Sequence, residues 1–161
     1  MKDFCINAKM QLAQYDELTD SDKRLVDMAK DATNRSYAPY SHFRVGAALL
    51  MANGETVIGC NQENAVFPAG LCAERTAIFS AQAQYPDVVI ETLAIAARNT
   101  SDKFVTEPVS PCGSCRQVIL EQECRLNHPI RILLVGESGI LIINTIKDLL
   151  PLCFMDESMR G

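Results

Sequence analysis

Two short segments of the chain combine side chains that bind metals with side chains that move protons. The first segment reads Cys72-Ala73-Glu74-Arg75, and the second reads Pro111-Cys112-Gly113-Ser114-Cys115-Arg116. Cys112 and Cys115 are three residues apart, so on one helical turn their sulfurs face the same way, which suits two ligands of one tetrahedral zinc ion. Taken alone, this pair fits a structural zinc site or a redox pair as well as it fits a catalytic metal.

A third cysteine favours the catalytic metal over the structural site and the redox pair. We expect Cys72 to begin one helix and Cys112 to lie in the first turn of another. Helix N-termini carry partial positive charge and lower the pKa of a thiol, which favours the thiolates that a metal requires. If the two N-termini meet, three thiolates leave a fourth position open, as in catalytic zinc sites, whereas structural sites usually have four protein ligands. We therefore predict that Cys72, Cys112 and Cys115 hold one Zn²⁺ per subunit.

Glu74 is the predicted general acid and base beside this metal. It lies two residues after Cys72, so its carboxylate is near the metal but points away from the ligand, where it can take a proton from a water that the metal activates. A structural zinc site has no use for such a glutamate. Arg75 and Arg116 lie beside the ligands in the chain, and we expect them to donate to the sulfurs and offset their negative charge.

Zinc enzymes that deaminate nucleobases use the same combination of groups. They carry three cysteines, or a histidine and two cysteines, with a glutamate that is not a ligand and a Pro-Cys-x-x-Cys sequence. The expected reaction is attack of the activated water at C4 of a cytosine ring. Glu74 would carry the proton onward to N3 and to the leaving amine.

The elements that must position these residues alternate between helices and strands. Residues 19–36 show apolar side chains at three- and four-residue steps, with Thr19 or Asp20 as the cap. Asn53-Gly54 between two apolar runs predicts a hairpin. Further helices are expected over 72–84, 111–123 (with Pro111 at its first position) and 145–150, strands over 45–51, 56–60, 92–97, 130–135 and 140–144, and a surface loop over 98–107. This order predicts one sheet covered by helices, an α/β or α+β architecture.

Length and composition exclude several classes of protein. The chain has 161 residues, 48% of them hydrophobic, which fits one globular domain over residues 1–161. A net charge of −5 without a basic block argues against a nucleic acid polymer as partner. No apolar run approaches the roughly 20 residues of a membrane helix, and the N-terminus lacks the apolar stretch of a secretory signal. Seven cysteines, an odd number, argue against a disulfide framework, so we expect a cytoplasmic protein.

At the residues named above, the sequence resembles the cytidine deaminase family, in particular its short, homotetrameric branch with three cysteine ligands. The resemblance extends over residues 25–154 and rests on four motifs in the same order. These are Tyr40-Ser41-His42-Phe43-Arg44-Val45-Gly46-Ala47-Ala48-Leu49, Gly59-Cys60-Asn61-Gln62-Glu63-Asn64-Ala65, Cys72-Ala73-Glu74-Arg75-Thr76-Ala77 and Ser110-Pro111-Cys112-Gly113-Ser114-Cys115-Arg116-Gln117. The resemblance implies a three-layer α/β/α fold with a mixed sheet. It also implies hydrolysis of free cytidine and deoxycytidine to uridine and deoxyuridine plus ammonia, in pyrimidine salvage.

The resemblance assigns roles to residues outside the metal site. It implies that Asn61 and Glu63 bind the ribose hydroxyls, that Phe43 packs against the base, and that the backbone amide of Ala73 holds the pyrimidine carbonyl oxygen. Phe154 would reach into the site of a neighbouring subunit, so that the site is complete only in a homo-oligomer, a tetramer in this family. Without the resemblance, a turn with a solvated glutamate and a core phenylalanine also explain Asn61, Glu63 and Phe43.

Two departures from the family pattern and three alternative functions stand beside this interpretation. Phe67 occupies a position where family members often carry tyrosine, and Arg44 one that is commonly smaller. A deaminase of another aminopyrimidine nucleoside, such as a nucleoside antibiotic, would share the motifs. A polynucleotide deaminase would use the same chemistry but must grip a strand. A non-catalytic zinc-stabilised module would need a fourth ligand, for which Cys60 and Cys124 are candidates.

Overall fold

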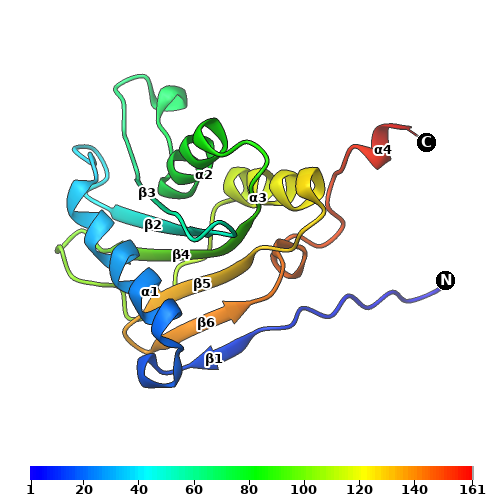
Figure 1. Cartoon of the computed structure of the whole chain (residues 1–161), viewed down its shortest axis with the longest axis horizontal. Coiled ribbons are helices and arrows are strands. Elements are labelled where there is room, and N and C mark those ends of the chain that lie inside the picture. The colour runs from blue at the N-terminus through cyan, green and yellow to red at the C-terminus, as the bar shows by residue number, and fades with distance from the viewer. Residues whose placement is uncertain (161) are drawn as a thin grey trace.

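The computed structural model describes residues 1–160, which form a six-stranded mixed sheet with helices on both of its faces (Figure 1). Gly161, the last residue of the expected domain, lies outside the described residues. The strand order is β1-β6-β5-β4-β2-β3, in which β4 and β5 run parallel and the other neighbours run antiparallel. The strands are β1 (Gln11–Ala13), β2 (Arg44–Met51), β3 (Thr56–Cys60), β4 (Ile90–Arg98), β5 (Arg131–Gly136) and β6 (Gly139–Ile143).

Three long helices complete the layers. They are α1 (Asp20–Ala32), α2 (Ala73–Gln84) and α3 (Gly113–Leu126), and a short α4 (Glu157–Arg160) follows near the C-terminus. Val26 of α1 belongs to an apolar cluster with Ala94 of β4 on one face of the sheet. Ile78 of α2 and Ile119 of α3 share a second cluster with Leu93 on the opposite face. The predicted mixed sheet between two helical layers is therefore confirmed, and α1 lies alone on its side of the sheet in Figure 1.

Most of the predicted elements are present, and the differences lie at helix ends. Thr19 caps α1 as expected, because its Oγ1 accepts a hydrogen bond from the backbone N of Asp22 at 3.1 Å. The helix predicted over 19–36 is α-helical only to Ala32 and then continues as a 3-10 turn. Pro111 is not the first residue of α3, because Cys112 is the N-cap and the helix begins after it.

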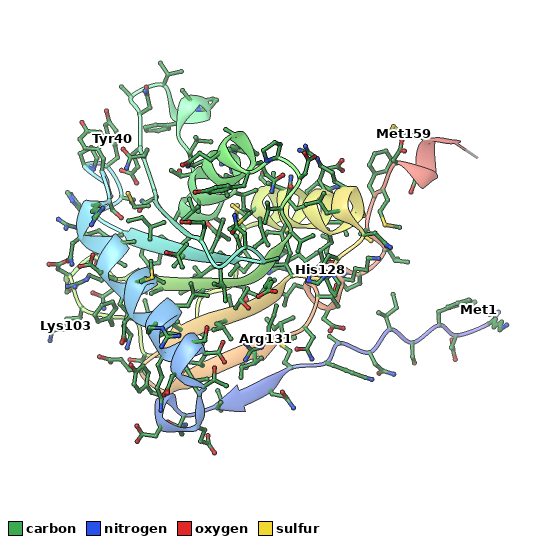
Figure 2. The ribbon with its side chains drawn as sticks, in the orientation of Figure 1. Met1, Tyr40, Lys103, His128, Arg131 and Met159 are labelled. Atoms are coloured by element: carbon green, nitrogen blue, oxygen red, sulfur yellow. The ribbon has the colours of Figure 1, made fainter. Side chains whose placement is uncertain are left out.

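The two ends of the chain differ more from the sequence prediction. The helix expected over 145–150 is a 3-10 helix, Ile146–Leu149, capped by the side chain of Thr145. Strand β1 was not predicted, because it is a three-residue edge strand whose side chains are mostly exposed and leave no apolar pattern. The residues before β1 extend away from the sheet toward Met1 (Figure 2). None of the helices within residues 1–160 is long and apolar enough to cross a membrane.

Glycines on β2 and β3 allow helices to approach the sheet closely. A Cβ at Gly59 of β3 would lie 2.4 Å from the carbonyl oxygen of Ala73 and 2.5 Å from the backbone N of Ala77, both in α2. A Cβ at Gly46 of β2 would lie 2.1 Å from the carbonyl oxygen of Ala29 in α1. Contacts this short exclude any side chain, so Gly59 sets how near the first turn of α2 lies to the sheet.

Candidate active site

The N-termini of α2 and α3 bring three cysteine sulfurs together. Cys72 is the N-cap of α2, Cys112 is the N-cap of α3, and Cys115 lies in the first turn of α3. Their Sγ atoms all lie within 4.8 Å of one another, and those of Cys72 and Cys112 are 3.8 Å apart. Neither N-cap side chain accepts a capping hydrogen bond from the backbone of its helix. The sulfurs therefore remain available beside the N–H groups of the two first turns, which lack helical partners.

The sulfurs of Cys72 and Cys112 have the spacing that tetrahedral zinc coordination requires. With Zn–S bonds of about 2.3 Å, two sulfurs of a tetrahedral site stand about 3.8 Å apart, as the Sγ atoms of Cys72 and Cys112 do. The candidate fourth ligand Cys60 instead donates its thiol to the carbonyl oxygen of Arg35 at 3.1 Å. The metal-ligating group found in the described part of the chain contains Cys72, Cys112 and Cys115. These residues fit a zinc ion that keeps one position open.

Arg75 supplies positive charge to this cluster. Its Nη2 donates to the Sγ of Cys72 over 3.6 Å, and its buried Nε is without a hydrogen-bond partner among the described residues. The hydrogen bond to Cys72 raises the pKa of the Arg75 guanidinium. Arg116 was also expected at the sulfurs, but its Nε donates to the carbonyl oxygen of Pro111 at 2.8 Å and its Nη1 to that of Leu149 at 2.5 Å. The expectation that Arg116 donates to the sulfurs is therefore wrong, because these hydrogen bonds go to backbone carbonyl groups.

The thiols of Cys72 and Cys115 hold their protons with different strength. A hydrogen bond from the Cys115 thiol, together with Arg75, lowers the pKa of Cys72 to about 5. Cys115 donates that hydrogen bond, is buried and lies near the Glu74 carboxylate, so the pKa of Cys115 is raised. Cys72 is thus a thiolate at neutral pH. Because zinc binds thiolates, binding of the ion releases the proton that Cys115 holds.

Glu74 is buried beside the cluster. It is the second residue of α2, and only 4% of its surface is exposed. Burial raises the pKa of its carboxyl, and the negative charge of Cys72 acts in the same direction, while a bond to the backbone N–H of Glu74 itself opposes them. A carboxyl that holds its proton more tightly than a solvated one is suited to deliver as well as accept protons near neutral pH.

A cavity of about 290 Å³ connects these groups with the residues that the family resemblance placed around a nucleoside. A volume of this size lies at the lower end of small-molecule pockets. Phe43, Asn61 and Glu63 all reach it. The full lining consists of Ser41, Phe43, Val45, Asn61, Glu63, Cys72, Glu74, Ile95, Val109, Ser110 and Cys112.

Sequence reasoning gave no site role to five of these residues. Ser41, Val45 and Ser110 lie inside the quoted motifs, so their position in the sequence carried a signal that they lie near the site. Ile95 is in the middle of a buried strand and Val109 lies in a loop, and nothing in the local sequence distinguishes them. Only the packing of β4 and of the loop before α3 brings them to the cavity.

Two expected substrate contacts do not line the cavity. Ala73 is fully buried at the first position of α2, where its backbone N–H has no helical partner. Phe154 is 59% exposed and follows the last 3-10 turn of the chain. The Nε2 of Gln117 on α3 donates to the carbonyl oxygen of Phe154 at 2.9 Å, which ties this segment to the helix that carries Cys115.

Asn61 holds the strand that begins at the cavity. Its Oδ1 accepts a hydrogen bond from the backbone N of Val45 at 2.8 Å, and its Nδ2 donates to the carbonyl oxygen of Phe43 at 2.9 Å. A side-chain amide has a second N–H and a second lone pair. Asn61 therefore fixes the backbone on both sides of Arg44 and still has groups left for a ligand.

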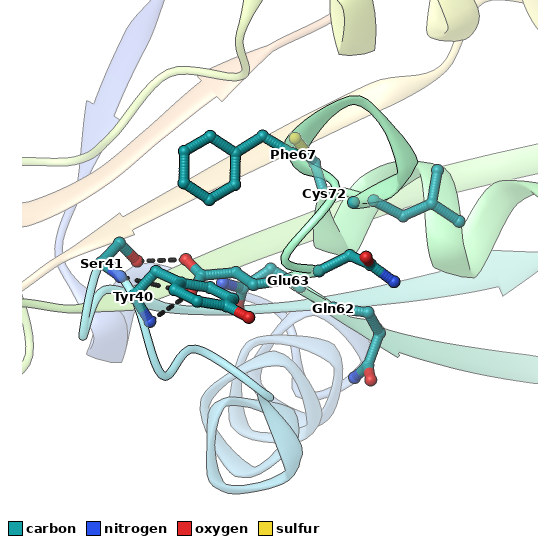
Figure 3. A pocket seen from close by; sticks show the side chains of 10 residues that line it. Tyr40, Ser41, Gln62, Glu63, Phe67 and Cys72 are labelled. Carbon is teal, nitrogen blue, oxygen red and sulfur yellow. Dashed lines mark hydrogen bonds between the residues drawn. The ribbon is translucent and has the colours of Figure 1, made fainter.

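Glu63 holds the preceding loop through both of its carboxylate oxygens. Its Oε2 accepts from the backbone N of Tyr40 at 2.9 Å and of Ser41 at 3.2 Å, and its Oε1 accepts from the hydroxyl of Ser41 (Figure 3). Partial burial opposes ionisation, but these hydrogen bonds outweigh it and lower the pKa of Glu63. Glu63 is therefore a carboxylate at neutral pH, an acceptor suited to hydroxyl groups.

A second cavity of about 400 Å³, whose lining side chains Figure 3 shows, shares part of its lining with the first. Tyr40 and Phe67 border it in an edge-to-face contact with ring centroids 5.6 Å apart. Phe67, the residue that departs from the family pattern, is 74% exposed. Glu74 and Cys112 line only the smaller cavity, so the reactive groups converge there.

Known proteins match this chain in sequence and in fold. The family model described as the cytidine and deoxycytidylate deaminase zinc-binding region matches residues 19–126. A cytidine deaminase of Sporosarcina psychrophila is 39% identical over 137 residues, which cover 85% of this chain and 93% of that protein. The crystal structure of the cytidine deaminase from Burkholderia pseudomallei has a TM-score of 0.71 at 36% identity. The match covers 85% of this chain and 100% of that protein. A more distant relative, the blasticidin-S deaminase of Bacillus cereus, is 29% identical over 137 residues, 84% of this chain and 93% of its own.

Proposed function

The chain belongs to the family defined by the cytidine and deoxycytidylate deaminase zinc-binding region, and we propose that it hydrolyses free cytidine and deoxycytidine to uridine and deoxyuridine plus ammonia. The observation that carries this proposal is one cavity lined by two of the three clustered cysteines, Cys72 and Cys112, together with a buried glutamate and two polar side chains suited to a sugar. A metal site without a reaction would have no need for the buried Glu74 or for the cavity.

The reaction proceeds through proton transfers by Glu74. Zinc held by Cys72, Cys112 and Cys115 supplies Lewis acidity that makes water nucleophilic at neutral pH. The Glu74 carboxylate takes a proton from the attacking water and delivers it to N3 of the pyrimidine as the C4–O bond forms. Glu74 then takes the remaining hydroxyl proton and passes it to the amino group. The C4–N bond breaks, and ammonia and the uracil product leave.

Four residues of this chain orient the nucleoside. Asn61 and Glu63 bind the ribose hydroxyls, since both line the cavity and both have unused acceptor or donor capacity. Phe43 also lines the cavity and packs against the base. The backbone N–H of Ala73, which has no helical partner at the start of α2, binds the pyrimidine carbonyl oxygen.

The working unit is a homo-oligomer, a tetramer by analogy with the family branch that the motifs resemble, built from one domain over residues 1–161. The exposed Phe154 reaches the cavity of a neighbouring subunit. All seven cysteines are thiols without disulfide bonds, which supports a reducing compartment, the cytoplasm. There the enzyme serves pyrimidine salvage.

The decisive experiment follows the ultraviolet absorbance of cytidine and deoxycytidine with the purified, zinc-loaded protein. We expect rapid loss of the cytosine signal with release of one ammonia per nucleoside. Glu74→Gln should lower turnover by about 10²- to 10⁴-fold, the usual contribution of a general acid or base, while its zinc content stays stoichiometric. Glu91→Gln, a glutamate exposed on β4, is the matched control and should keep full activity. A zinc-loaded wild type that converts neither nucleoside would overturn the proposal.

A second candidate substrate is an aminopyrimidine nucleoside antibiotic, favoured by the likeness to a blasticidin-S deaminase. Higher kcat/KM on such an analogue than on cytidine would favour it. Faster conversion of cytosine in an oligonucleotide than in cytidine would point to a polynucleotide deaminase. A non-catalytic zinc module requires that Cys60→Ser or Cys124→Ser lose zinc, whereas we expect both variants to retain it.

A further inference from the structure

We propose that Ser41 is a positioning residue for the nucleoside, because its hydroxyl couples the carboxylate of Glu63 to the backbone of Phe43. This inference rests on the proposed function, in which Glu63 meets the sugar and Phe43 meets the base. Ser41 itself lines both neighbouring cavities. It comes from a loop that Figure 3 shows directly against Glu63.

The hydrogen bonds of Ser41 fix the direction of its hydroxyl. Its Oγ accepts a bond from the backbone N of Phe43 at 3.0 Å and donates to Oε1 of Glu63. A serine hydroxyl has one proton and two lone pairs. Since the ionised Glu63 carboxylate can only accept, the hydroxyl proton points to Glu63 while the Phe43 N–H occupies one lone pair, and the hydroxyl links the two residues.

Ser41 also decides which part of Glu63 is left for a ligand. A carboxylate offers about four acceptor positions. The backbone N–H groups of Tyr40 and Ser41 take the two positions on Oε2, at 2.9 and 3.2 Å, and the Ser41 hydroxyl takes one on Oε1. One acceptor position on Oε1 therefore remains, in a direction set by the Ser41 hydroxyl. A sugar hydroxyl that donates to Glu63 has to approach along that direction.

On the other side, Ser41 supports an unfavourable turn that leads to Phe43. His42, between the two residues, has a φ of +54°, a left-handed conformation that is unfavourable for a residue with a side chain. The bond from Phe43 N to Ser41 Oγ spans this turn, as serine hydroxyls often do. Asn61 then holds the carbonyl oxygen of Phe43 at 2.9 Å. Loss of the Ser41 hydroxyl would therefore release the Phe43 backbone on one side and misdirect Glu63 on the other.

The test compares two substrates and three variants by steady-state kinetics. For Ser41→Ala we expect KM for cytidine to rise about tenfold, as loss of a charge-assisted hydrogen bond implies, with kcat changed by less than about threefold. The rise in KM for 2′,3′-dideoxycytidine, which lacks the 2′- and 3′-hydroxyls that would donate to Glu63, should be at least about threefold smaller. Ser41→Thr keeps the hydroxyl and should restore KM. Ser36→Ala is the matched control, because Ser36 donates to the carbonyl oxygen of Val45 at 3.0 Å without touching Glu63.

Three outcomes overturn this inference. One is an unchanged KM for cytidine in Ser41→Ala. Another is an equal loss on both nucleosides, accompanied by a lower melting temperature and no rescue by Ser41→Thr, which would assign Ser41 a purely structural role. A wild-type enzyme inactive on both nucleosides would defeat the proposed function and this inference with it, whereas an active wild type with equal losses would defeat the inference alone.

Discussion

The net charge around three thiolates determines how strongly a zinc ion in this site can acidify water. Three thiolates with Zn²⁺ leave a net negative group, which weakens the power of the metal to acidify water. Two features of this chain oppose that charge. Arg75 donates to the Sγ of Cys72, and the N-termini of α2 and α3 direct partial positive charge toward the sulfurs of Cys72 and Cys112.

We predict that Arg75→Ala lowers zinc affinity by about ten- to a hundredfold, the usual effect of removing a group that supports metal ligands. The physical reason is that the guanidinium stabilises the thiolate form of Cys72. Competition for zinc with a chromophoric chelator measures the change. Arg125→Ala is the control, because Arg125 lies on α3 but donates to the carbonyl oxygen of Pro86. Wild-type zinc affinity in Arg75→Ala would mean that the helix N-termini alone offset the charge.

The sequence predicted the residues that act through local spacing and missed those that act through long-range contacts. A helical turn determines the relative direction of side chains that are two or three residues apart. This made it possible to predict the pair Cys112 and Cys115 and the pair Cys72 and Glu74 from the sequence. Arg116 was assigned to the sulfurs because it is adjacent to Cys115, yet its Nη1 bonds to a carbonyl 33 residues away. The bond of Ser41 to Glu63 spans 22 residues. No local pattern reveals such pairs, since they depend on how the loops are folded together.

At the level of secondary structure, the position of α2 against β3 places the metal ligands. Gly59 allows this contact, and the first turn of α2 carries both Cys72 as its cap and Glu74. The strands and helices themselves were predictable, because buried strands and amphipathic helices have distinct apolar periods. Strand β1 was not predictable, because its pairing with β6 uses the backbone and leaves its side chains mostly exposed.

We predict that Gly59→Ala displaces α2, destabilises the fold by roughly 1–3 kcal/mol and weakens zinc binding. The added Cβ would lie 2.4 Å from a backbone oxygen of α2, so the helix itself has to move. Gly46→Ala is the matched control, since its Cβ would clash with α1 on the opposite face. It should lower the unfolding free energy similarly yet leave zinc affinity unchanged. Chemical denaturation and chelator competition measure the two effects separately, and equal zinc affinities in the two variants would contradict the prediction.

A partly buried ion pair joins α1 to the sheet and makes stability depend on pH. Arg131 of β5 donates from Nη1 and Nη2 to the two carboxylate oxygens of Asp22 at 2.6 and 2.9 Å. Burial opposes ionisation of Asp22, but the bonds from Arg131 and Thr19 outweigh it and lower the pKa of Asp22. A lowered pKa in the folded state stabilises the protein above the unfolded pKa of about 3.9, and this contribution is lost as the pH falls through the folded value.

Asp22→Asn should therefore cost on the order of 1 kcal/mol of unfolding free energy at pH 7, and the difference from wild type should shrink below about pH 4. Urea unfolding at one protein concentration and several pH values measures it. Asp31→Asn is the control on the same helix, because Asp31 pairs with Arg35 at 3.8 Å with both side chains 65% exposed. Such a pair contributes little. A cost for Asp22→Asn that does not change with pH would rule out the ion pair as its cause.

At the scale of the whole molecule, the surface carries apolar side chains that a lone subunit does not cover. Phe67 beside the larger cavity is 74% exposed, Phe79 on α2 is 47% exposed and Phe154 is 59% exposed. Exposed apolar side chains mark an interaction surface where they form one contiguous patch, as a subunit contact of the proposed homo-oligomer would require. Phe79 lies on the helix that carries Glu74, and Phe67 borders the cavity next to the reactive one. A neighbouring subunit that covers these groups would lie close to the site.

If Phe154 completes the site of a neighbouring subunit, two inactive variants should regain turnover when they are co-expressed. Phe154→Ala keeps Glu74 but lacks the aromatic group, and Glu74→Gln keeps Phe154 but lacks the proton carrier. Co-expressed subunits would form mixed oligomers in which a Phe154 from one variant meets a Glu74 from the other. We expect turnover well above the sum of the two separate variants, measured by loss of cytidine absorbance. Phe154→Ala co-expressed with the double variant Glu74→Gln/Phe154→Ala is the control and should stay inactive, because no subunit then carries Phe154. Mixed oligomers that show only the summed activity would place Phe154 outside its neighbour's site.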